Sequence, residues 1–194
     1  MGFVWILIIL AIIVVGWMIS VYNFFVSSKA RIKAAVQEIG NQLKRQADLI
    51  PNLEESTKGY LKHEKAIFDK LTDARKSINK AIESGDVQKM ADAGSKLAAV
   101  LPDIKVIVES NPQIKGSEVV SKLMDELRDT ADKVMYSRRL LIDLSADYNV
   151  RRATFPSNII ANMFSFEEMK GLKTPDEGME VKSEEMKTPK VKLD

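Results

Sequence analysis

The chain opens with a long run of hydrophobic residues that leaves no polar face. Between Phe3 and Ile19, 12 of the 17 residues are Phe, Val, Ile or Leu, and the apolar character continues to Val26. A helix from Phe3 to Val26 would be about 36 Å long at about 1.5 Å per residue, enough to cross a hydrocarbon core of about 30 Å. No charged residue precedes Lys29 and no small-x-small cleavage site follows the run. The pattern therefore predicts a transmembrane helix rather than a cleaved signal peptide.

Beyond residue 29 the hydrophobic residues change to a helical spacing that continues to Ala153. The clearest stripe repeats every seven residues, at Val120, Leu127, Val134, Leu141 and Tyr148. Three earlier stripes fall within 32–50, 53–82 and 90–107. Sustained spacing of this kind is typical of long helices packed at a shallow angle. The sequence therefore predicts an all-α fold, with an N-terminal transmembrane helix followed by an antiparallel four-helix bundle of long helices.

Turn residues indicate where these helices end. Ser84-Gly85-Asp86 closes the second predicted helix and offers Asp86 as the N-cap of the third. Asn111-Pro112 and Gly116-Ser117 separate the third helix from the fourth. Between the first and second helices, the pattern predicts a turn or a kink at 48–51, because Pro51 is acceptable in the first turn of a new helix.

The C-terminal part divides into an apolar segment and a charged tail. The segment from Thr154 to Phe166 is interrupted by Pro156, and it could pack along the bundle, contact lipid or bind a partner. The last 28 residues hold eight acidic and six basic side chains, a composition that predicts disorder. We therefore divide the chain into a transmembrane anchor (1–28), a four-helix bundle (29–166) and a charged, disordered tail (167–194).

Charge and composition exclude several classes of function. The chain has 29 basic and 27 acidic residues, and the bundle region holds 23 and 19 of them, a net charge of +4. This is well below the density of positive charge expected of a nucleic-acid-binding protein. The chain has no cysteine and only one histidine, His63. Disulfides, Cys/His zinc sites, iron–sulfur clusters and Cys–His nucleophiles are therefore excluded.

The remaining candidate sites favour structural interpretations. A di-metal centre in a four-helix bundle needs two Glu-x-x-His pairs, but Tyr60 stands three positions before His63. Ser27-Ser28-Lys29 does not form a Ser–Lys dyad, because adjacent helical residues do not face each other. The carboxylates of the last helix fit a solvated face better than an acid–base site; they are Asp125, Asp129, Asp132, Asp143 and Asp147. The sequence thus predicts no catalytic, cofactor-binding or metal-binding residue, and a protein that is not an enzyme.

Two arginine pairs leave two interpretations open. Arg138-Arg139 and Arg151-Arg152 could bind lipid phosphates or an acidic partner, since guanidinium groups make bidentate contacts. The alternative, which we favour, is ion pairing inside the bundle with Asp143 and Asp147 at spacings of four residues.

Four stretches along the chain form a recognisable set. They are Gln-Leu-Lys-Arg-Gln-Ala-Asp-Leu-Ile-Pro-Asn-Leu at 42–53, Asn-Pro-Gln-Ile-Lys at 111–115, Asp-Tyr-Asn at 147–149 and Phe-Pro-Ser-Asn at 155–158. Together they resemble the LemA family of bacterial membrane proteins, and the resemblance covers residues 20–166. Leu140-Leu141-Ile142, Asn162 and Ser165 depart from the family pattern, so the chain resembles a divergent member. The resemblance implies an N-terminal anchor and a four-helix domain, and it implies no reaction.

Charge flanking the apolar run predicts the orientation in the membrane. Lys29, Arg31 and Lys33 follow the run closely, whereas only the amino terminus precedes it. The positive-inside rule then places the N-terminus outside and the bundle in the cytoplasm. With the bacterial family in view, we expect a single-pass protein of the inner membrane.

These observations together predict a non-enzymatic membrane protein. We expect a protein-interaction or scaffold module at the inner membrane, with the membrane and an unidentified protein as partners. The alternative is a lipid-engaging, membrane-organising protein, in which the segment 155–166 contacts lipid directly. Neither nucleic acid nor a small-molecule substrate is expected as a partner, and no cofactor is expected.

Overall fold

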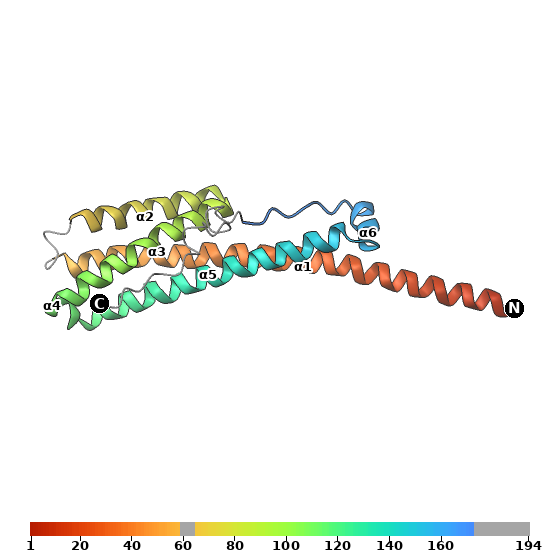
Figure 1. The fold of residues 1–194 in the computed structure, drawn as a ribbon, viewed down its shortest axis with the longest axis horizontal. Coiled ribbons are helices and arrows are strands. Elements are labelled where there is room, and N and C mark those ends of the chain that lie inside the picture. The colour runs from red at the N-terminus through yellow and green to blue at the C-terminus, as the bar shows by residue number, and fades with distance from the viewer. Residues whose placement is uncertain (59–64, 173–194) are drawn as a thin grey trace, which may run out of the picture.

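The computed structural model describes residues 1–58 and 65–172, and these residues are almost entirely helical (Figure 1). No strand occurs in this part of the chain. The predicted all-α fold is therefore confirmed. The helices are α1 (Gly2–Thr57), α2 (Lys65–Ser84), α3 (Val87–Ser110), α4 (Pro112–Lys115), α5 (Glu118–Ala153) and α6 (Ser157–Met163).

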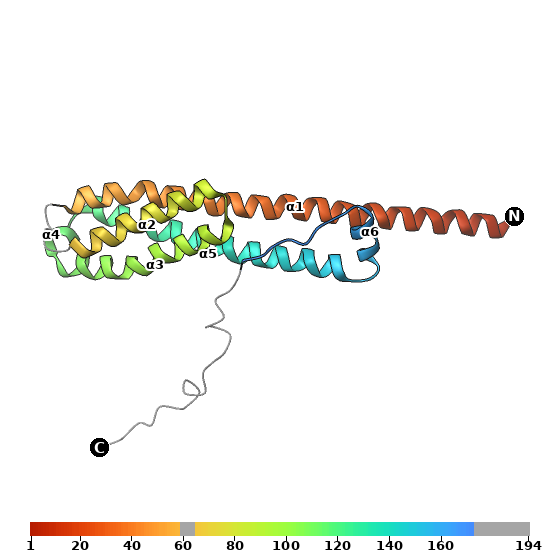
Figure 2. The same cartoon turned by 90° about the horizontal axis from the view of Figure 1, so that it is seen from above.

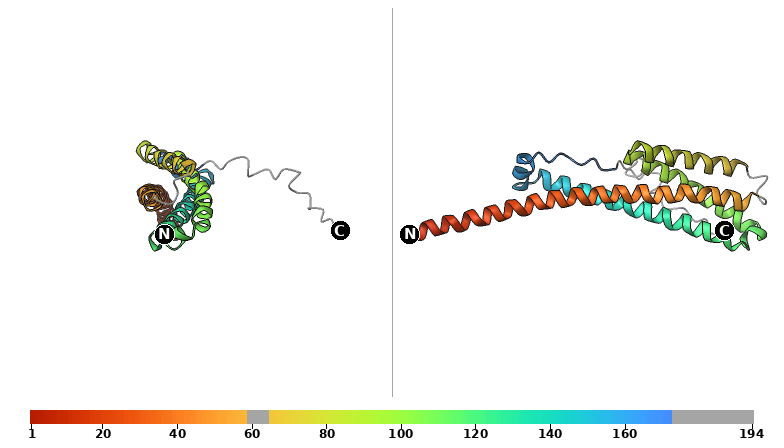
Figure 3. Two further views of the ribbon diagram at one scale, coloured as in Figure 1. Left: turned by 90° about the vertical axis from the view of Figure 1, so that its left-hand side faces the viewer. Right: turned by 180° about the vertical axis from the view of Figure 1, so that it is seen from behind.

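The second half of α1 packs with α2, α3 and α5 into an elongated bundle (Figure 2). These four helices alternate in direction, so the predicted antiparallel four-helix bundle is confirmed (Figure 1). The contact between α1 and α5 is the most extensive among the described helices. α2 and α3 pack against each other, and this pair contacts α1 and α5. Figure 3 shows the N-terminal part of α1 projecting beyond α6 from one end of the bundle.

The predicted heptad stripe of α5 forms the centre of the core. All five of its side chains are buried: Val120, Leu127, Val134, Leu141 and Tyr148. Ile39, Leu43 and Ile50 of α1 are buried in the same hydrophobic cluster. Each large apolar side chain buried in this way contributes about 1.5–3 kcal/mol to folding. The α1–α5 seam is thus the principal source of stability in the described residues.

Of the turn or kink predicted at 48–51, the turn is wrong, because α1 continues through Pro51 to Thr57. A proline inside a helix removes the hydrogen bond to the carbonyl four residues earlier and costs about 3 kcal/mol. Ile50 and Leu53 lie on either side of Pro51 and are fully buried. At about 1.5–3 kcal/mol each, burial of these two side chains offsets that cost. Packing, rather than local preference, therefore carries the helix past the proline.

The turn predicted at 84–86 is confirmed, and its geometry explains the sharp reversal between α2 and α3. Gly85 has a φ of +65°, a conformation that favours glycine. Asp86 Oδ1 then accepts hydrogen bonds from the backbone N–H groups of Gln88 (2.9 Å) and Lys89 (3.2 Å), which caps α3. Ser117 caps α5 in the same manner, by accepting from the N–H of Val120.

The bundle and the apolar run belong to one helix. α1 passes the division predicted between residues 28 and 29 without a break, and Val21 and Phe25 are already buried against the bundle. Before Val21 the large side chains lie mostly exposed. Among the described helices, α1 is the one that is long and apolar enough to cross a membrane. The bundle is consequently joined to the candidate span without a flexible linker.

We expect Pro51→Ala to raise the free energy of unfolding by about 1–3 kcal/mol, because it restores a main-chain hydrogen bond in the interior of α1. Thermal unfolding of the full chain in detergent, followed by circular dichroism, measures this change. Gly40→Ala is the matched control in the same helix: a Cβ at Gly40 meets nothing within 4 Å, and the gain should be about 0.5–1 kcal/mol. A loss of stability in Pro51→Ala would mean that the helix ends near residue 51 after all.

Candidate functional site

The acidic residues of α5 do not converge on a site. Asp125, Asp129, Asp132, Asp143 and Asp147 are all exposed. Asp129 accepts a 2.6 Å hydrogen bond from Lys133 one turn away, which is an ordinary surface pair. Within 1–58 and 65–172, no three His, Cys, Asp or Glu side chains gather where they could hold a metal ion. Tyr60 and His63 lie outside the described residues.

Three of the four arginines, Arg138, Arg151 and Arg152, have other partners than the predicted carboxylates. Arg138 Nη1 donates a 2.9 Å hydrogen bond to Ser95 Oγ on α3, and Arg152 Nε donates a 2.8 Å bond to the carbonyl of Phe166. The Arg151 guanidinium lies 4.2 Å from the ring centre of Phe24 on α1. An exposed i,i+4 ion pair contributes only a few tenths of a kcal/mol, so contacts between elements prevail over it.

A groove of about 710 Å³ runs along the outer side of the α1–α5 seam. Its floor is apolar and its rim carries charges of both signs. The floor is formed by Ala34, Ala35, Leu140 and Leu144, and the rim includes Arg31, Glu38, Gln42 and Lys133. Tyr136 stands at the edge with 69% of its surface exposed. A groove of this kind is suited to binding an apolar segment of a partner, with the rim selecting its charge.

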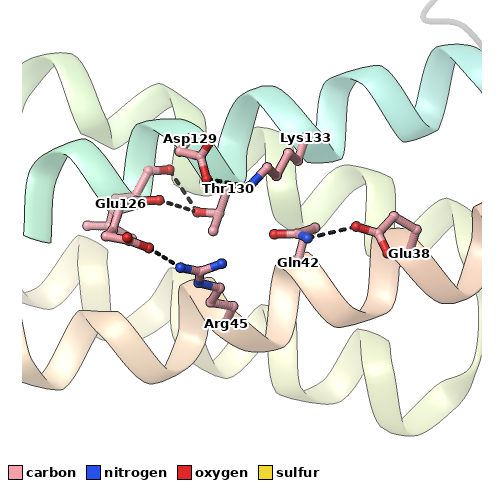
Figure 4. Close-up of polar contacts among 8 residues, drawn as sticks. Glu38, Gln42, Arg45, Glu126, Asp129, Thr130 and Lys133 are labelled. Atoms are coloured by element: carbon pink, nitrogen blue, oxygen red, sulfur yellow. Dashed lines mark hydrogen bonds and ion pairs between the residues drawn. The ribbon is translucent and has the colours of Figure 1, made fainter.

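One polar group in the groove is left without a partner. Gln42 Nε2 donates a 2.7 Å hydrogen bond to Glu38 Oε1, but Gln42 Oε1 is buried and receives no hydrogen bond from the described residues (Figure 4). The neighbouring Arg45 is committed to an ion pair with Glu126, and the Thr130 hydroxyl donates back to its own helix (Figure 4). Gln42 Oε1 is therefore a buried acceptor whose hydrogen-bonding capacity is not used by the described residues.

The groove lining offers few polar groups. Among the lining residues, Ser137 and Tyr136 carry hydroxyls and Glu38 is the one carboxylate. The hydrophobic spacing of α5 did not predict this site. Tyr136 falls at an exposed position between the buried Val134 and Ser137, where the spacing predicts an ordinary surface residue. Its signal is an aromatic side chain on the outer face of a helix, which only the structure distinguishes from an ordinary surface residue.

The residues 164–172, here called the return segment, run back along the bundle from α6 (Figure 2). Asn149 holds this segment by a pair of hydrogen bonds to Met169: its Nδ2 donates to the carbonyl (2.8 Å), and its Oδ1 accepts from the N–H (2.9 Å). Met169 and Leu172 pack against the core. Six residues of the predicted tail, 167–172, are thus ordered on the bundle, whereas 173–194 lie outside the described residues.

Aromatic side chains close the end of the bundle next to the candidate span. Phe166 stacks on Phe25 with 4.8 Å between ring centres, and Phe25 meets Tyr148 edge-on at 5.3 Å. Burial raises the pKa of the Tyr148 phenol above its ordinary value of 10.0, with the charges of Arg152 and Glu167 acting in opposite directions. The Tyr148 hydroxyl is buried and has no hydrogen-bond partner among the described residues.

Comparison with known proteins returns one family. The model of the LemA family matches residues 35–192, which is most of the chain. No curated protein matches the chain.

We expect Tyr148→Phe to raise the free energy of unfolding by about 1 kcal/mol at neutral pH, because it removes a buried, unpaired hydroxyl. Because burial raises the pKa of Tyr148, the folded state holds the phenol proton more tightly than the unfolded state does. This preference costs no stability below pH 10.0, but the free energy of unfolding falls as the pH rises from there through the folded-state pKa. The wild-type chain should therefore lose more stability than Tyr148→Phe between pH 9 and pH 11, a range chosen around the ordinary tyrosine pKa of about 10. Thermal unfolding across this range, with the exposed Tyr136→Phe as control, checks both effects. Equal alkaline losses in all three proteins would contradict the pH effect, and a lower stability of Tyr148→Phe than of the wild type at neutral pH would contradict the first.

Proposed function

The chain belongs to the LemA family, and we propose that it acts as a membrane-anchored, non-enzymatic scaffold that presents a protein-binding surface at a fixed position relative to the membrane. The observation that carries this proposal is the continuity of α1. One helix of 56 residues, about 84 Å long at 1.5 Å per residue, contains both the candidate span and the first helix of the bundle.

Continuity matters because it removes the freedom that a linker would give. Phe25, at the end of the apolar run, and Ile32, a few residues beyond it, are both buried against the bundle. The bundle cannot then reorient independently of the span. A surface on α1 or α5 therefore keeps a defined distance from the membrane and a defined orientation relative to it. This suits a protein that positions a partner rather than one that turns over a substrate.

The groove between α1 and α5 is the surface that we propose for the partner. It combines an exposed aromatic residue, an apolar floor and an arginine, and such residues dominate the binding energy of protein interfaces. These features support a partner that inserts apolar side chains between Tyr136 and Leu140.

We further propose that the protein lies in the bacterial inner membrane with its N-terminus outside and its bundle in the cytoplasm. Lys29, Arg31 and Lys33 are exposed on α1 immediately after the apolar run, where positive charge is retained on the cytoplasmic side.

A second candidate function is direct engagement of lipid. Phe155 is 74% exposed at the end of the bundle nearest the candidate span, where an apolar side chain of that size can enter the bilayer surface. This function does not require a protein partner.

The orientation can be tested with one cysteine, because the chain has none. Ser84 is exposed at the tip between α2 and α3, and Ser84→Cys should react with a membrane-impermeant maleimide only after the cells are broken. Labelling in intact cells would place the bundle outside the membrane and reverse the proposed orientation.

The scaffold role predicts a protein contact at Tyr136. A photo-crosslinking amino acid at position 136 should give discrete protein adducts in intact cells, because this side chain borders the groove. The same amino acid at Met135 is the matched control: Met135 is similarly exposed, at 63%, but does not line the groove. Leu140→Arg should abolish the adducts at 136 by placing a charge on the apolar floor. Identical adducts at 135 and 136, or none at either, would count against a scaffold that uses this groove.

A further inference from the structure

A cluster of exposed apolar side chains lies where the bundle meets the candidate span. It is carried by residues 155–164, here called the α6 foot, which comprise α6 and the turns on either side of it. Phe155 is 74% exposed, and Ile159 and Met163 are each 54% exposed. The buried face of α6, with Ile160 and Ala161, packs against the bundle, so the exposed face is not needed to hold the helix in place.

The α6 foot lies against the span itself and not merely near it. Phe164 meets Tyr22 edge-on with 4.8 Å between ring centres. Together with Val15, Met18 and Ile19, these two residues line a fully apolar groove of about 290 Å³. Because α1 is a single helix, contact with residues 15–22 fixes the level of the α6 foot along the span.

That level coincides with the boundary of a bilayer. A hydrocarbon core of about 30 Å takes up about 20 helical residues. The exposed apolar part of α1 ends just before the buried Val21, so the core ends in the neighbourhood of Tyr22. Val15 lies about 10 Å along the helix axis from Tyr22. A segment packed between these two positions therefore lies in the outermost part of the hydrocarbon and in the headgroup layer.

The charges around the α6 foot agree with this level. Residues 153–166 contain no charged side chain. Just outside this segment, Arg151 lies on the Phe24 ring and Lys29 lies 5.8 Å from the centre of the Phe166 ring; both side chains are exposed. Basic residues next to an apolar surface can reach lipid phosphates while the apolar side chains insert below them.

We propose that the α6 foot is an interfacial membrane-binding site, which inserts Phe155, Ile159 and Met163 into the leaflet from which α1 emerges. The inference rests on the proposed anchoring of α1, since the level of the foot is defined by the span. It adds a second point of attachment, which fixes the tilt and rotation of the bundle on the membrane. The occupant of this apolar surface is lipid, and neither a second copy of the chain nor another protein covers it.

The test uses the full chain in nanodiscs of phosphatidylcholine and phosphatidylglycerol. A single cysteine at Met163 or Ile159 carries an environment-sensitive fluorophore, and a parallel sample contains phosphatidylcholine brominated on its acyl chains. We expect a blue-shifted emission and a loss of intensity with the brominated lipid at both positions. Met135→Cys, 63% exposed on α5 and distant from the foot, is the matched control and should show neither effect.

A label at Ile12, in the middle of the candidate span, separates the two proposals. Quenching at Ile12 without quenching at Met163 and Ile159 would overturn the α6 foot and leave the anchor standing. Absence of quenching at Ile12 would overturn the anchor, and the foot with it. A blue shift at Met163 without quenching by brominated lipid would mean that protein covers the surface, and this result would also overturn the proposal.

Discussion

The packing of α5 along α1 is the interaction on which the rest of the structure depends. α5 has a buried residue at every seventh position, and α1 contributes a second row of buried residues that includes Ile39, Leu43 and Ile50. This seam carries α1 past Pro51 without a break, creates the groove on its outer side and brings α6 back to the candidate span. Since α1 also contains the apolar run, the seam fixes the bundle to the candidate span as one body.

Much of this arrangement follows from the sequence, because the responsible interactions are repetitive or local. The heptad row from Val120 to Tyr148 predicts a buried face by its spacing alone, and the cap at Asp86 involves residues only two and three positions away. The turn expected at Pro51 shows where such reasoning fails. The local cost of proline is known, but the burial of Ile50 and Leu53 depends on helices that come later in the chain.

The return segment and the groove could not be predicted, for different reasons. Asn149 holds the return segment through the backbone of Met169, and a backbone partner leaves no trace in the pattern of side chains. Arg138 donates a hydrogen bond to Ser95 on another helix, whereas Asp143 and Asp147 are nearer in the sequence and were the predicted partners. The groove arises from two helix surfaces, each of which is unremarkable in isolation, so its apolar floor becomes visible only when α1 and α5 are placed together.

The central claim is that span and bundle form one rigid helix-based unit, and a distance distribution tests it most directly. Spin labels at Ile12→Cys and Met135→Cys would lie on the span and on α5, at two exposed positions of an otherwise cysteine-free chain. Double electron–electron resonance in nanodiscs should give a single narrow distribution, because no flexible joint separates the two sites. A broad distribution would mean that α1 bends or unfolds between the span and the bundle, and it would contradict the account.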